Sequence, residues 1–109
     1  MMDSLPVPTD AHIDSLLAYA GAGSGNAADS VTEIARGLEQ LRDTGTAEFR
    51  ARDADVLADV GEQLKRGALG MLGAGEAPPE TQREAHLRLR AADDFLEVSE
   101  IIRARVAAG

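Results

Sequence analysis

The chain has 109 residues, a formal net charge of −8 at pH 7, and neither cysteine nor tryptophan. This length fits one domain with one core, and because aromatic residues are few, leucine, isoleucine, valine and alanine must supply nearly all of its buried area. The absence of cysteine excludes disulfides, thiolate catalysis and thiolate metal sites, and it leaves the redox compartment undetermined. A reducing cytoplasm is the default expectation. We therefore expect residues 1–109 to form a single helical domain.

The negative charge is confined to the first part of the chain. Residues 1–62 carry twelve acidic and four basic side chains, whereas residues 63–109 carry seven of each. A surface that binds nucleic acid or an anionic membrane needs clustered lysine and arginine, and the basic side chains here stand among carboxylates. We expect no nucleic-acid binding.

The N-terminal residues also exclude two kinds of targeting. They lack the basic and apolar regions of a Sec signal peptide, and no apolar run of the chain reaches the roughly 20 residues that span a bilayer. Neither Sec export nor membrane insertion is expected, although export without a cleaved leader would leave no such mark.

The first predicted element is a short helix whose apolar residues, from Ile13 to Ala20, recur at helical spacing. Thr9 or Asp10 is its expected N-cap. We expect residues 1–8 to be flexible, and residues 21–26, rich in glycine and serine, to form a loop.

The second and third helices are predicted to form a central antiparallel hairpin. Apolar residues between Ala27 and Leu41 alternate four and three residues apart, and Gly45 supplies the stop. The connection at 44–46 is short enough for a tight turn, after which a third helix is expected to begin before Phe49 and reach Met71 or Leu72.

The fourth predicted helix begins at Pro79 and runs close to the C-terminus. Proline fits the first turn of a helix, where its missing N–H loses no bond. Four glycines in residues 67–75 favour either a fraying end of the third helix or a partner packed closely against it, and residues 73–78 are expected to be a loop. No segment alternates with period two, so the fold class is all-α, a small bundle of about four helices without a sheet.

No motif predicts catalysis, a cofactor or a metal. The glycine-rich residues 21–25 suggest a nucleotide loop, but position 26 is asparagine and no later strands exist to support such a loop. His86 shares a face of the fourth helix with Arg90, Asp93 and Glu97, opposite the apolar residues, which indicates a solvated face. The serines lie in no nucleophile elbow, and His12 has no obvious partner, so we expect a protein that is not an enzyme.

The leading hypothesis for function is a non-catalytic protein–protein interaction module, such as an adaptor or regulatory subunit, that binds a partner or itself. The fourth helix has more apolar surface than the short first helix can cover. The glycine-rich end of the third helix adds further apolar residues. The predicted partner-binding residues are Phe95, Val98, Ile102, Leu69, Met71 and Leu72.

Two alternatives remain open. The acidic first part of the chain suits an inhibitor, immunity-type or nucleic-acid-mimicking protein that binds a basic target, with Asp55, Asp59 and Glu62 as its contact residues. The layout of a glycine- and serine-containing first part followed by helix, proline turn and helix is similar in outline to small rod or needle subunits of type III secretion machinery, without a shared motif. That resemblance implies a subunit of a helical assembly.

Overall fold

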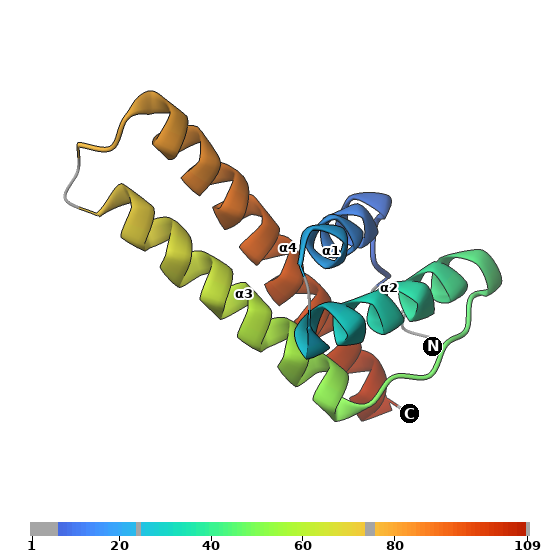
Figure 1. Cartoon of the computed structure of the whole chain (residues 1–109). Helices are drawn as coiled ribbons and strands as arrows, with labels where there is room; N and C mark the ends of the chain where they lie inside the picture. The colour runs from blue at the N-terminus through green and yellow to red at the C-terminus, as the bar shows by residue number, and fades with distance from the viewer. Residues whose placement is uncertain (1–6, 24, 74–75, 109) are drawn as a thin grey trace.

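The molecule is built of four α-helices, and no strand occurs in the part of the chain that the structure describes (Figure 1). The described residues of this computed structural model are 7–23, 25–73 and 76–108. The helices are α1 (Asp10–Ala22), α2 (Asn26–Thr44), α3 (Ala51–Leu72) and α4 (Pro79–Ala108). The all-α prediction of about four helices is confirmed. None of the described helices combines the length and apolarity that crossing a bilayer requires.

The helix ends follow local signals in the sequence. Thr9 caps α1, because its Oγ1 accepts a hydrogen bond from the backbone N–H of His12 at 3.2 Å. Gly45 ends α2 with a φ of 82°, the left-handed conformation that glycine adopts without steric cost. Pro79 opens α4, and α3 continues until Gly73 ends it, so most of the glycine-rich stretch is helical. Residues 1–6 of the segment expected to be flexible lie outside the described part of the chain. So do residue 24 of the loop expected at 21–26 and residues 74 and 75 of the loop expected at 73–78.

The most extensive helix pair is α3 with α4, which run antiparallel and side by side (Figure 1). Their contact is close because small residues line it. A Cβ added at Gly61 would lie 2.9 Å from Cγ of Leu96, too near for an undisturbed fit. The buried hydroxyl of Ser99 donates a hydrogen bond to the carbonyl oxygen of Ala54 at 2.8 Å, which ties the two helices at their body end.

The pairing differs from the prediction in one respect, since the sequence placed the central hairpin between the second and third helices. Residues 45–50 form a longer connection than expected, and α3 begins only at Ala51. Phe49, predicted to be helical, lies in this connection and packs against Gly37 of α2. Because the connection is long enough to redirect the chain, α2 crosses α3 obliquely (Figure 1).

α1 and α2 cover only one end of the α3–α4 hairpin. We call this end the body (residues 7–63 and 91–108) and the uncovered remainder of the two helices the arm (residues 64–72 and 79–90). The arm projects from the body in Figure 1, and the first and last described residues lie at the body end. The Cα radius of gyration is 15.0 Å, whereas a compact chain of this length has about 13 Å. The arm therefore makes the molecule elongated.

The core lies in the body, where all four helices meet. Phe95 of α4 is fully buried at its centre, and its ring lies 5.3 Å from that of Tyr19 in an edge-to-face arrangement. The other buried apolar residues of this cluster are Ile13, Leu16, Val31, Ile34, Ala35, Leu38, Ala54, Leu57, Val60, Val98 and Ile102.

Candidate functional site

The three residues of α4 predicted to contact a partner are part of the core. Phe95, Val98 and Ile102 are each 0% exposed. This corrects the prediction, and the reason is geometric: α3 and α1 both pack against α4, and their side chains join those of α2 in one buried cluster, so the wide apolar arc of α4 is covered from several sides. A partner can reach these side chains only if the body opens.

The predicted apolar residues of α3 lie together in its last turn, on the arm. Leu69 is 52% exposed on the arm, and Met71 and Leu72 beside it are half-buried.

The three acidic residues, Asp55, Asp59 and Glu62, are exposed nearer the start of α3. Asp55 is already paired, since its Oδ1 accepts from Nη2 of Arg103 in α4 at 3.1 Å. The structure therefore does not join the acidic and the apolar predictions into one site.

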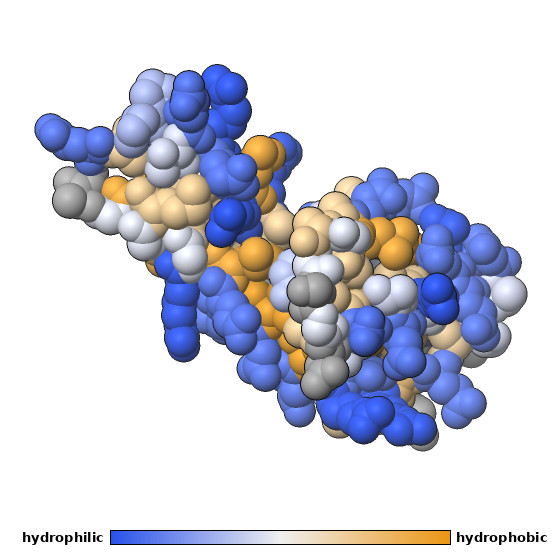
Figure 2. All heavy atoms as spheres, viewed as in Figure 1, coloured by the Kyte–Doolittle hydropathy of each residue, from blue (hydrophilic) through white to orange (hydrophobic). Residues whose placement is uncertain are grey.

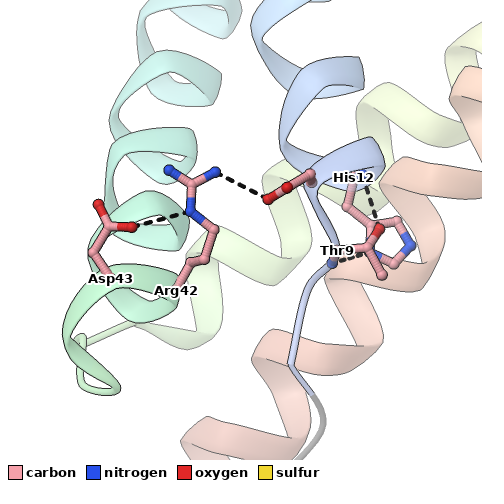
Figure 3. Close-up of polar contacts among 5 residues, drawn as sticks. Thr9, His12, Arg42 and Asp43 are labelled. Atoms are coloured by element: carbon pink, nitrogen blue, oxygen red, sulfur yellow. Dashed lines mark hydrogen bonds and ion pairs between the residues drawn. The ribbon is translucent and has the colours of Figure 1, made fainter.

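A polar cluster at the α1–α4 contact is the feature that the sequence did not predict. The Nδ1 atom of His12 accepts a hydrogen bond from the backbone N–H of Thr9 at 3.0 Å (Figure 3). The proton of a neutral imidazole must then sit on Nε2, which donates to Oε2 of Glu97 at 2.7 Å. His12 thus caps α1 with one nitrogen and holds α4 with the other.

Ser15, one turn along α1, adds a second link by donating to Oδ2 of Asp94. His12, Asp94 and Glu97 offer ligand atoms within 4.8 Å of one another, which is a composition that metal ions accept. Each of these atoms, however, already has a hydrogen-bond role, and a metal on Nε2 would have to displace the proton that the Thr9 N–H fixes there. Among the described residues no hydrogen bond joins Ser15 to His12, as a nucleophile and its base would require. The cluster holds α1 against α4, and we call its four residues, His12, Ser15, Asp94 and Glu97, the latch.

A third polar contact joins α1 to the end of α2. Nη1 of Arg42 donates to Oδ1 of Asp10 at 3.0 Å, and its Nε donates to Oδ1 of Asp43 at 3.1 Å (Figure 3). The hydrogen bond to Asp10, and to a lesser extent that to Asp43, raises the pKa of the Arg42 guanidinium above its ordinary value. Arg42 therefore keeps its positive charge except in strong alkali. The pairs are exposed, and such pairs contribute little to stability.

An apolar groove of about 470 Å³ lies in the notch where the arm leaves the body. Tyr19 of α1, Leu64 of α3 and Leu87 and Ala91 of α4 supply its apolar walls. Leu87 is 56% exposed, the largest exposure of any leucine that the structure describes. Figure 2 shows apolar surface gathered in this notch, between the hydrophilic surfaces of arm and body. We call it the notch groove.

An acidic depression of about 580 Å³ adjoins the notch groove along the α1–α4 contact. It shares Ser15, Leu87 and Ala91 with the notch groove and is otherwise lined by Ala11 and Asp14 of α1 and by polar residues of α4. These two depressions give the molecule one continuous surface that is apolar on one side and acidic on the other.

The charge is distributed differently in space than along the chain, where the net negative charge falls within residues 1–62. The arm carries five basic and two acidic side chains, a net charge of +3, whereas the described body carries fifteen acidic and six basic ones, a net charge of −9. The basic residues of the arm come from both α3 and α4. The molecule therefore has a positively charged arm and a negatively charged body.

A scan against protein-family models and searches of curated proteins and of solved structures find no match to this chain. The function is therefore inferred from the geometry of the notch groove, the latch and the charge distribution.

Proposed function

We propose that this chain is a non-catalytic protein–protein interaction module that binds a partner in the notch groove. The observation that carries the proposal is the exposure of Leu87, 56%, in a groove with Tyr19 and Leu64. Ala68 and Ala85 of the arm are fully buried, but Leu87 stays exposed. An apolar groove between helices is a usual receptor for an amphipathic helix.

The polar cluster supports a non-catalytic role. Ser15 and His12, the residues nearest to a nucleophile and a base, each bind a carboxylate of α4 and thereby fix α1 as one wall of the groove. In this proposal the cluster positions α1, and the neighbouring apolar residues make the contact.

The test is site-specific photocrosslinking in the native host, with a benzophenone amino acid in place of Leu87. We expect an adduct of defined mass at position 87 and none at Arg36, an exposed control position on α2. Equal adducts at both positions, or none at either, would show that the notch groove is not a binding site.

The acidic alternative has one observation in its favour. Asp59 and Glu62 are exposed and, within the described residues, take part in no ion pair, on a body with a net charge of −9. A benzophenone at position 62 distinguishes the two functions, because an adduct there without one at position 87 would favour a basic target on the acidic face of α3.

A further inference from the structure

Resting on the proposed interaction function, we infer that the occupant of the notch groove is a second copy of this chain. The two copies dock antiparallel, so that the arm of each lies against the body of the other about a two-fold axis near Leu87. Such an isologous arrangement uses the same surface twice and closes on itself.

The first support is a stripe of α4 whose charge changes sign along its length. Arg83, Leu87, Arg90, Asp94 and Glu97 follow one another at spacings of four and three residues, which places them on one face of the helix. The stripe is basic on the arm and acidic on the body. In an antiparallel copy with the axis at Leu87, Arg83 lies opposite position 91 of the other copy, which borders the acidic depression lined by Asp14 and Asp94.

The second support is the charge of the whole surface. An arm of +3 laid against a body of −9 is attractive in both halves of a two-fold dimer. A parallel arrangement would place arm on arm and body on body, where like charges repel. The charge distribution therefore selects the antiparallel orientation.

The third support is the shape of the arm. On α3, Leu64, Gly67 and Met71 lie on one face at spacings of three and four residues, in line with the notch groove. Nothing lies within 4 Å of a Cβ placed at Gly67, so a helix of the second copy can approach the backbone closely there.

The size of the contact sets its strength. Each arm is about 20 Å long at about 1.5 Å per residue and two helices wide, at about 10 Å each, which gives roughly 400 Å² of face. Each copy contributes its arm face and an equal area of its body, roughly 800 Å² in all, which is the size of a standard interface at about 800 Å² per partner. Interfaces of this size reach micromolar affinity or better, and we expect a dissociation constant on the order of micromolar.

Sedimentation equilibrium of the purified chain at about 1 μM to 1 mM tests the inference. We expect a monomer–dimer equilibrium for the wild type and a dissociation constant raised at least about tenfold by Leu87→Glu. Leu69→Glu is the matched control, because Leu69 is equally exposed on the arm, at 52%, but lies off the face defined by Leu64, Gly67 and Met71. Circular dichroism should show that both variants stay folded.

A charge exchange tests the orientation. Arg83→Glu and Asp14→Arg should each weaken the dimer severalfold, and the double variant should restore it, since arm and body then attract again with reversed signs. Failure of the double variant to recover would overturn the antiparallel arrangement.

A wild type that remains monomeric throughout this range overturns the self-association. If position 87 nevertheless forms a photoadduct with a different protein, the proposed function stands and only the identity of the occupant is wrong. If neither occurs, both proposals fail.

Discussion

At the scale of single residues, His12 shows how one side chain serves two elements. Its Nδ1 completes the cap of α1, and its Nε2 holds Glu97 of α4, 85 positions away in the chain. The spacing of Thr9 and His12 is that of a capping box, so half of this role was open to sequence analysis. The other half depends on α1 lying across α4, which no local pattern specifies.

Replacing His12 with alanine should remove both hydrogen bonds at once. We expect the free energy of unfolding to fall by about 1–2 kcal/mol, the usual cost of a lost cap together with one partly buried hydrogen bond. Urea denaturation followed by circular dichroism measures this change. Alanine at His86, which is exposed on the same helix as Glu97, is the control and should leave the midpoint unchanged.

Two glycines of α3 should respond in opposite directions to the same substitution. Gly61→Ala puts a methyl group 2.9 Å from Leu96, and the resulting overpacking of about 1–3 kcal/mol exceeds the gain in helix propensity of about 1 kcal/mol. Gly67→Ala meets no atom within 4 Å and should raise the free energy of unfolding by up to about 1 kcal/mol. Melting temperatures measured at a concentration where the chain is monomeric test both signs. A higher melting temperature for Gly61→Ala would contradict the close contact between α3 and α4.

At the scale of elements, the two halves of α4 have different surroundings. Its C-terminal half is surrounded in the body, and its N-terminal half forms one side of the arm (Figure 1). Replacing a large apolar side chain with alanine should therefore lower the free energy of unfolding more in the C-terminal half than in the N-terminal half.

Phe95→Ala should destabilise the fold by about 3–5 kcal/mol, the range for removing a fully buried aromatic ring. Leu87→Ala, in the arm, should change stability by less than about 1 kcal/mol, because more than half of that side chain is exposed. Denaturant midpoints of the two variants provide the comparison. Similar losses for both would mean that the arm is part of the cooperative core.

The sequence predicted the helices well because their signals are local. Pro79, Gly45 and Thr9 mark helix ends through backbone chemistry that acts within a few residues. Helix pairing depends on which surfaces meet in three dimensions, so the α3–α4 pair and the burial of Phe95 were not accessible from spacing. For the candidate site, the predicted residues Phe95, Val98 and Ile102 of α4 are buried, and the exposed part of its apolar arc lies at Leu87, nearer the start of the helix.

At the scale of the whole molecule, the opposed charges of arm and body should make self-association depend on salt. The Debye length falls from about 10 Å at 0.1 M to about 3 Å at 1 M salt, so attraction between arm and body is screened. We expect the dissociation constant of the dimer to rise severalfold over this range, as measured by sedimentation equilibrium. An affinity that grew steadily with salt would instead point to apolar contacts alone.

The position of the chain ends also has a practical and a mechanical consequence. The first and last described residues both belong to the body, and the tip of the arm points the other way (Figure 1). A fluorescent protein or an immobilising tag attached to either end would therefore leave the arm unobstructed. A molecule immobilised through its body would keep the arm exposed to solvent.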